Sequence, residues 1–204
     1  MSEIYALSDD TLTPPQTIFS QIDEILRCGV KLVQYRSKLA AQDEALIRSL
    51  IDLCEDYGAK LIINDDAALA KKLGAHGVHI GADDGETAQV REFLGADKII
   101  GVSCYADLAR ARQAEAQGAS YVAFGSLRRG KTKPDAPLCP DALVQEARKS
   151  LNLPIAVIGG ISLENLNEIL ILKPDYIAMV EAIYKPASIT QNLANLKEKM
   201  DEYI

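Results

Sequence analysis

The stretch KLIINDDAALAKKLGAHGVHI, residues 60–80, contains one complete strand–helix–strand unit. Its two ends, residues 60–63 and 77–80, are short and apolar, with the branched side chains that are typical of strands. Between them, residues 67–73 have the composition of a short helix, and Gly74 follows at the position where helices commonly end in a left-handed turn. Two such strands joined by a helix indicate a parallel βαβ unit.

The same alternation continues in both directions to the two ends of the chain. It gives eight candidate strands, at residues 4–7, 31–35, 60–63, 77–80, 99–102, 121–124, 155–158 and 176–179. It also gives eight candidate helices, at residues 17–27, 44–57, 67–73, 86–94, 107–117, 141–150, 163–170 and 189–203. Eight strand–helix pairs favour a closed (β/α)8 TIM barrel over an open doubly wound sheet. No linker or change of composition divides the chain, so we expect residues 1–204 to form a single barrel domain.

The composition excludes several classes of function. The 204 residues are 48% hydrophobic and 25% charged, as in an ordinary globular domain, and the net charge of −7 argues against nucleic-acid binding. The four cysteines form no Cys-x-x-Cys pair, and therefore no zinc motif. No signal peptide is evident, and no apolar run approaches the roughly 20 residues that span a bilayer. We expect a cytoplasmic protein without a membrane partner. The sequence is compatible with a homo-oligomer but does not decide the oligomeric state.

In a barrel of this kind, the loops at the carboxyl ends of the strands carry the chemistry. The second predicted strand leads into Gln34, Arg36 and Lys38, which alternate with apolar or small residues. If those neighbours face the helices, Gln34 and Arg36 point towards the barrel axis. A cation there needs an anionic partner, which is either a bound phosphate or an internal acid such as Asp65.

Carboxylates follow the next two predicted strands, with Asp65 beside Asn64 and Asp84 in the following loop. Adjacent strands lie about 4.8 Å apart, so these acids can share one cation. Mg²⁺ typically takes one or two carboxylates and completes its shell with water and phosphate oxygens. Alternatively, acids in these loops cap the following helices, as we expect for Asp66 or Asp83.

Two further loops could receive a phosphate. After the sixth predicted strand the chain reads Gly125-Ser126-Leu127-Arg128-Arg129-Gly130-Lys131-Thr132-Lys133-Pro134. Backbone amides with cations can cradle a phosphate, although a charge run is often simply solvated. Gly159 and Gly160, after the seventh strand, allow close approach of backbone amides to a phosphate or merely form a tight turn.

The remaining polar residues indicate neither a hydrolase nor a histidine metal site. The chain has two histidines, and we expect His79 to be packed or hydrogen-bonded inside the barrel. Ser103, after the fifth predicted strand, has no histidine placed for a triad and is better suited to donate a hydrogen bond to a ligand. We expect Cys104 to be an ordinary cysteine.

Taken in order, these segments resemble the thiamine-phosphate synthase (thiamine-phosphate pyrophosphorylase) family along nearly the whole chain. The resemblance is carried by Gln34-Tyr35-Arg36-Ser37-Lys38, Ile63-Asn64-Asp65, Gly77-Val78-His79-Ile80-Gly81 with Asp84, Gly101-Val102-Ser103, Thr132-Lys133 and Ile158-Gly159-Gly160-Ile161. It implies an Mg²⁺-dependent transferase that joins an aminopyrimidine methyl diphosphate to a thiazole phosphate. The products are thiamine phosphate and pyrophosphate.

The resemblance also implies a role for each matching position. The pyrimidine and its diphosphate are assigned to Gln34, Arg36, Lys38, Asn64, Ser103 and Lys133. The catalytic residues among these are Arg36, Lys38, Ser103 and Lys133. Mg²⁺ is assigned to Asp65 and Asp84. The thiazole phosphate is assigned to Thr132, Gly160 and the segment after the last strand, Val180 and Glu181.

Two features depart from the family pattern. Members commonly carry an aromatic–Pro–Thr/Ser element where this chain has Arg128-Arg129-Gly130-Lys131, and often a serine near Glu181. Two alternatives follow: a thiazole tautomerase-like isomerase on the same barrel, and a catalytically silent paralogue that binds phosphorylated ligands. The tautomerase is disfavoured because Ser103-Cys104-Tyr105 contains no histidine for proton transfer.

Overall fold

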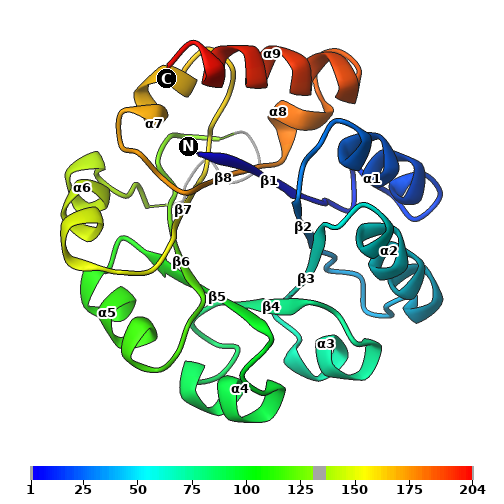
Figure 1. Ribbon diagram of the computed structural model, residues 1–204, viewed down its shortest axis with the longest axis horizontal. Coiled ribbons are helices and arrows are strands. Elements are labelled where there is room, and N and C mark those ends of the chain that lie inside the picture. The colour runs from blue at the N-terminus through cyan, green and yellow to red at the C-terminus, as the bar shows by residue number, and fades with distance from the viewer. Residues whose placement is uncertain (1, 131–136, 204) are drawn as a thin grey trace.

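Eight parallel strands close into one barrel, and the helices surround it (Figure 1). The computed structural model describes residues 2–130 and 137–203. The strands are β1 (Glu3–Leu7), β2 (Leu32–Tyr35), β3 (Lys60–Asn64), β4 (Gly77–Ile80), β5 (Ile99–Tyr105), β6 (Tyr121–Phe124), β7 (Ile155–Ile158) and β8 (Tyr176–Met179). The helices of the described residues are α1 (Ile18–Arg27), α2 (Glu44–Asp56), α3 (Ala67–Leu73), α4 (Thr87–Leu94), α5 (Leu108–Ala116), α6 (Asp141–Ser150), α7 (Leu166–Leu170), α8 (Glu181–Tyr184) and α9 (Ile189–Asp201). The predicted TIM barrel is confirmed.

Every predicted strand and helix is present, with small shifts at the ends. The largest shifts are in β5, which continues through an irregularity to Tyr105, and in α7, which begins at Leu166. The prediction of eight helices was wrong, because the described part of the chain has a ninth, α8. This single turn buries one apolar side chain, Ile183, and is too short for helical periodicity to show.

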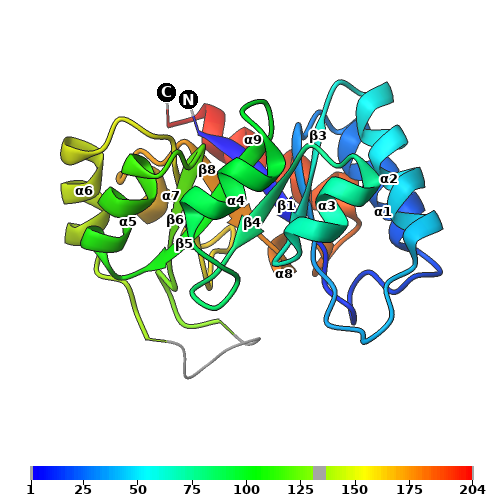
Figure 2. The same cartoon turned by 90° about the horizontal axis from the view of Figure 1, so that it is seen from below.

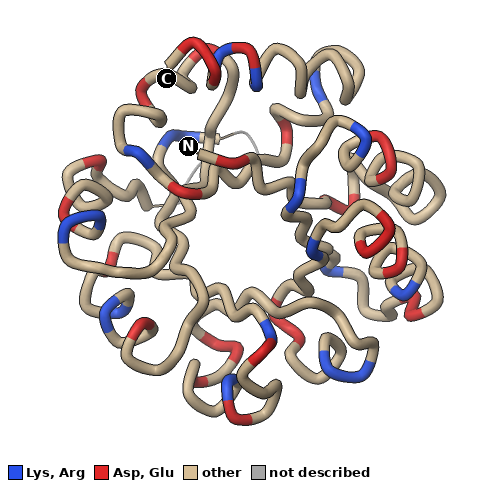
Figure 3. Tube along the Cα trace, viewed as in Figure 1, with Lys and Arg blue, Asp and Glu red and all other residues tan. Residues whose placement is uncertain are grey.

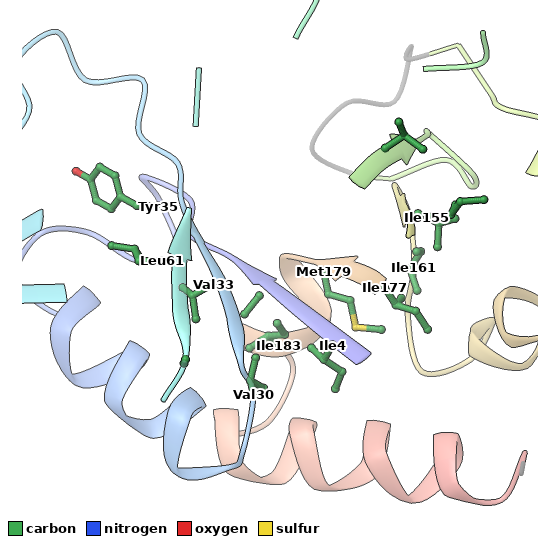
Figure 4. Close-up of a cluster of buried hydrophobic side chains, with 14 of the residues drawn as sticks. Ile4, Val30, Val33, Tyr35, Leu61, Ile155, Ile161, Ile177, Met179 and Ile183 are labelled. Atoms are coloured by element: carbon green, nitrogen blue, oxygen red, sulfur yellow. The ribbon is translucent and has the colours of Figure 1, made fainter. Parts of the chain in front are cut away.

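Alternation along the strands separates two apolar layers. One layer lies between the strands and the helices, and Figure 4 shows part of it, including Val33 and Tyr35. The opposite phase fills the barrel interior with Tyr5, Leu7, Leu32, Ile62, Tyr121, Ala123, Ala156 and Ala178. Because Val33 and Tyr35 belong to the outer layer, Gln34 faces the barrel axis, as the alternation predicts, and is buried there.

Local signals fix where the site loops end. The Asp66 carboxylate accepts a hydrogen bond from the Leu69 backbone N–H at 2.8 Å and so caps α3, as predicted. Asp83 does not cap the next helix, because α4 starts after Glu86 and has no side-chain cap. With Asp66 used as the cap, Asp65 precedes the helix and belongs to the end of β3.

The loops after β1, β2 and β6 project from one side of the barrel, opposite the two chain termini (Figure 2). This is the face formed by the carboxyl ends of the strands, where (β/α)8 proteins carry their chemistry. Within the described ranges, no helix is long and apolar enough to cross a membrane.

Candidate active site

Most charged residues lie on the surrounding helices and loops, while the ring of strands is largely uncharged (Figure 3). Arg36 and Lys38 lie in the loop that directly follows β2. The Lys38 ammonium lies 2.5 Å from Asp65 Oδ2, so the internal acid considered for Arg36 pairs with Lys38 instead. The Arg36 guanidinium forms no hydrogen bond or ion pair with residues 2–130 or 137–203. A partly buried cation in this position is suited to an incoming anion.

The backbone at Arg36 is held firmly. Its N–H donates to Ser8 Oγ at 2.7 Å, and the Ser8 hydroxyl donates to the Arg36 carbonyl at 3.1 Å. These bonds join the ends of β1 and β2. The main chain is thus fixed by structure, while the guanidinium is left available for a ligand.

Asp65 and Asp84 bring two carboxyl groups together at the ends of β3 and β4. Burial alone raises the pKa of Asp65, but the Lys38 ammonium, the Asp84 hydrogen bond and the Arg36 charge hold it below its usual value. Burial and the nearby Asp65 charge raise the pKa of Asp84, against the hydrogen bond that it accepts from the Gly81 N–H at 2.7 Å. The two carboxyl groups are therefore close enough to affect each other, and a cation bound between them would relieve their repulsion.

This donor set fits Mg²⁺ better than it fits a transition metal. No group of three or more His, Cys, Asp or Glu side chains that could hold a metal occurs among the described residues. Two carboxylates can serve Mg²⁺, because this ion takes few protein ligands and completes its octahedron with water and phosphate oxygens. Asp65 and Asp84 are the residues that would hold it.

A chain of hydrogen bonds crosses the barrel interior below these charges. Gln34 Nε2 donates to the Tyr5 hydroxyl at 2.8 Å, and the Tyr5 and Tyr121 hydroxyls are 2.9 Å apart. The Tyr121 hydroxyl lies 2.8 Å from His79 Nδ1, and His79 Nε2 lies 2.8 Å from Ser103 Oγ. His79 is thus hydrogen-bonded inside the barrel, as predicted. Gln34 and Ser103, both predicted to bind substrate, are the two ends of this chain.

Because of His79, we expect the folded protein to become less stable in mild acid. Burial lowers its pKa from 6.5 to about 4, and the Asp65 charge opposes the shift only in part. An unfolded chain binds the proton below pH 6.5 but the folded chain does so only near pH 4, so the contribution of His79 to folding stability falls across that window. The largest loss of unfolding free energy that this one group can cause is about 3 kcal/mol.

Denaturant unfolding between pH 7.5 and 4.5 measures this effect. The His79→Gln variant should lose less unfolding free energy over that range than the unmodified chain, because its glutamine does not titrate. The other acidic groups are common to both proteins. Parallel pH curves would contradict the burial of a neutral imidazole.

Three residues at or below this face carry no motif. Arg110, from α5, donates to the Ser103 carbonyl at 2.8 Å and to the Gly81 carbonyl at 2.9 Å, which ties the end of β5 to the end of β4. Tyr5 and Tyr121 read as ordinary strand residues in sequence. The alternation of side chains along each strand could have identified the two tyrosines, because both occupy positions that point into the barrel.

On the opposite side of the mouth, the loops after β6 and β7 are joined by backbone hydrogen bonds. The Leu127 N–H donates to the Ile158 carbonyl at 2.9 Å, and the Arg128 N–H donates to the Gly159 carbonyl at 3.0 Å. Gly160 has φ +61°, and a Cβ there would lie 2.5 Å from the Arg128 carbonyl oxygen, so only glycine fits. The predicted residues Thr132 and Lys133 lie outside the described residues.

Arg128, one of the cations of the loop after β6, pairs with acidic residues of two neighbouring helices. Its guanidinium donates to both carboxylate oxygens of Asp141, at 2.8 and 2.9 Å, and to Glu168 at 3.1 Å. A bidentate pair of this kind fixes a guanidinium in one orientation. Arg128 therefore ties its loop to α6 and α7.

The two predicted residues after β8 lie at the barrel mouth and at the start of α8. Val180 packs against the interior layer at the barrel mouth, and Glu181 opens α8 in a partly buried position. The predicted residues thus form two groups. One comprises Gln34, Arg36, Lys38, Asn64, Asp65, Asp84 and Ser103 on the adjacent strands β2 to β5, and the other comprises Gly160, Val180 and Glu181 after β7 and β8.

Comparison with known proteins gives a consistent result. Residues 4–183 match the sequence family described as thiamine monophosphate synthase. The chain is 45% identical over 190 residues to thiamine-phosphate synthase of Nitrosococcus oceani, covering 91% of this chain and 87% of that protein. It is 44% identical over 179 residues to thiamine-phosphate synthase of Azoarcus sp., covering 86% of each. The solved thiamine phosphate pyrophosphorylase from Pyrococcus furiosus superimposes with a TM-score of 0.88 at 26% identity, covering 99% of this chain and 96% of the other.

Proposed function

Because this chain belongs to the thiamine-phosphate synthase family of transferases, we propose that its barrel mouth joins an aminopyrimidine methyl diphosphate to a thiazole phosphate. The reaction releases pyrophosphate and forms thiamine phosphate. We assign it to the whole chain, residues 1–204, as a single barrel domain acting in the cytoplasm.

The observation that supports this function best is the convergence of opposite charges on adjacent strand ends. Arg36 and Lys38 follow β2, Asp65 follows β3, and Asp84 follows β4. Lys38 already contacts Asp65, and Asp65 contacts Asp84. Cations beside a pair of acids are the groups needed to bind a diphosphate together with its divalent metal.

Departure of the diphosphate is the demanding step, because breaking the carbon–oxygen bond adds one negative charge to a leaving group that is already anionic. Mg²⁺ on Asp65 and Asp84 supplies charge neutralisation when bound. We assign Arg36, Lys38 and Lys133 to the same diphosphate, because cations beside a leaving group stabilise the charge that develops on it. The carbon–oxygen bond breaks with its electron pair on the diphosphate, and the thiazole nitrogen supplies the pair for the new bond.

Gln34, Asn64 and Ser103 position the pyrimidine in this proposal. Gln34 and Ser103 face the axis from β2 and β5, and Asn64 occupies the inward position at the end of β3. His79 lies beside Ser103, where the sequence suggested no histidine. The reaction as proposed nevertheless requires no nucleophile or general base. The reaction depends on holding two substrates in line.

The thiazole phosphate is assigned to the other side of the mouth. Thr132 and Gly160 supply a hydroxyl and a backbone amide, and Val180 with the start of α8 at Glu181 completes the pocket. On this side, Gly160 has the left-handed conformation at φ +61°, and its backbone amide is the group that we assign to the phosphate.

The first experiment is pyrophosphate release from the purified chain with both substrates and Mg²⁺, repeated with EDTA. Release that needs both substrates and the metal supports the synthase and shows that Glu181 and the Arg128–Lys131 departure are compatible with turnover. Isomerisation of a thiazole carboxylate phosphate without metal would support the tautomerase instead. Binding of both substrates without pyrophosphate release would identify a silent paralogue.

A further inference from the structure

The hydrogen-bonded chain through the barrel interior contains three side chains that the proposed reaction does not use: Tyr5, Tyr121 and His79. Their exposed fractions are 1%, 2% and 8%. Burying hydroxyl and imidazole groups among apolar residues is unfavourable unless each forms hydrogen bonds, and an apolar interior would be simpler to build. Packing alone therefore does not explain why this hydrogen-bonded chain of side chains is present.

Glycine at position 101 leaves the space that the hydrogen-bonded chain of side chains needs. In the strand register, Gly101 pairs with His79 on β4 and with Tyr121 on β6. A Cβ on Gly101 would lie 2.1 Å from the Tyr121 ring, so the ring occupies the space above the glycine and reaches His79. The two rings stack with centroids 5.6 Å apart, while the Tyr121 hydroxyl meets His79 Nδ1.

Hydrogen-bond counting gives the chain a direction. Gln34 Nε2 donates to Tyr5, so the Tyr5 proton is available for Tyr121, and the Tyr121 proton is then available for His79 Nδ1. A neutral imidazole that accepts at Nδ1 carries its proton at Nε2. That proton points at Ser103 Oγ, and the serine hydrogen has to point elsewhere.

We propose that Tyr5, Tyr121 and His79 are positioning residues that hold the Ser103 hydroxyl as a hydrogen-bond donor towards the substrate. The proposal rests on the proposed role of Ser103 in binding the aminopyrimidine diphosphate. His79 Nε2–H occupies a lone pair of the serine oxygen, so the serine offers its own proton to an acceptor such as a ring nitrogen or a phosphate oxygen. With the opposite direction, His79 would carry the proton on Nδ1, and the Ser103 proton would be directed at the imidazole.

The imidazole tautomer tests the direction without any activity. The chain has two histidines, so nitrogen-15 spectra of the full protein at pH 7.5 can be assigned with the His76→Gln variant. We expect His79 to be protonated at Nε2 in the unmodified chain, with Nδ1 carrying the shift of a hydrogen-bond acceptor. In Tyr121→Phe the Nδ1 partner is lost, and the Nε2–H population should fall. Protonation at Nδ1 in the unmodified chain would overturn the proposal.

Kinetics of Tyr121→Phe tests the consequence, with Tyr176→Phe as the matched control. The Tyr176 ring packs against Tyr5 and Tyr121 at centroid distances of 6.4 and 5.9 Å, but its hydroxyl takes no part in the chain. Tyr121→Phe should lower kcat/KM for the pyrimidine diphosphate about tenfold, the effect of one neutral hydrogen bond. The KM for thiazole phosphate should not change, and Tyr176→Phe should behave like the unmodified enzyme.

A double variant separates positioning from a general structural defect. If Tyr121 acts through Ser103, adding Tyr121→Phe to Ser103→Ala should cost almost nothing further. An undiminished penalty in the Ser103→Ala background would overturn the positioning role, as would equal losses in Tyr121→Phe and Tyr176→Phe. If the unmodified chain releases no pyrophosphate, the proposed function fails, and the tautomer measurement still decides the direction of the chain.

Discussion

Replacing Asp84 with asparagine is expected to lower kcat/KM about a thousandfold, and Asp65→Asn should have a similar effect. Both variants remove half of the negative charge that accepts Mg²⁺, while asparagine keeps the shape of the side chain. Asparagine at position 84 can still accept the Gly81 N–H, and the Lys38–Asp65 pair is too exposed to matter much for stability. The fold should therefore be retained.

Pyrophosphate release measured over a range of MgCl₂ concentrations checks this expectation. The apparent affinity for Mg²⁺ should weaken together with turnover. Asp83→Asn is the matched control, because this exposed neighbour makes the same charge change in the same loop without facing Asp65. Unchanged turnover of Asp84→Asn or Asp65→Asn would remove that residue from the metal site.

Arg36→Ala should lower kcat/KM for the pyrimidine diphosphate by about a hundredfold or more, which is typical for loss of one charge that stabilises a leaving group. The guanidinium has no hydrogen-bond or ion-pair partner among the described residues, so its removal leaves no protein group unpaired. The two hydrogen bonds with Ser8 involve only the Arg36 backbone and survive the substitution. Stability should therefore change little.

Steady-state kinetics with each substrate varied in turn measures the effect. The loss should appear with the diphosphate substrate, and the KM for thiazole phosphate should stay close to its original value. Arg112→Ala is the control, since this exposed arginine on α5 removes the same charge and pairs with Glu146, at 3.9 Å, instead of with any predicted site residue in the described part of the chain. An equal loss in both variants would assign the effect of Arg36 to net charge rather than to contact with the diphosphate.

Most of the barrel could be predicted from the sequence because its signals are local. Apolar runs such as 77–80, ended by glycines or acids, mark strands whatever the rest of the chain does. Alternation within β2 placed Gln34 on the barrel axis, because successive side chains in any strand point to opposite faces. The α8 turn was missed for the same reason, since one turn has too few residues to show a period.

The sequence predicted that the charged candidate residues gather at the strand ends, but it did not predict which of them form ion pairs with one another. Their places at strand ends follow from the count of strands, and all strands of a parallel barrel end on the same face. Their partners depend on side-chain reach across loops. Lys38 rather than Arg36 meets Asp65, and Arg128 turns away to Asp141 and Glu168 although it belongs to the most basic loop of the chain.

The sequence by itself determined that residues such as Gln34, Arg36 and Asp65 come at strand ends, and closure of the barrel decided which side chains interact. Tyr5 and Tyr121 meet across 116 residues of chain, and Tyr121 and His79 across 42. No pattern within a strand predicts such contacts, because they exist only once eight strands surround a common axis and Gly101 leaves room for a ring. Alternation follows from the geometry of a single strand, whereas this polar chain follows from the packing of five strands against one another.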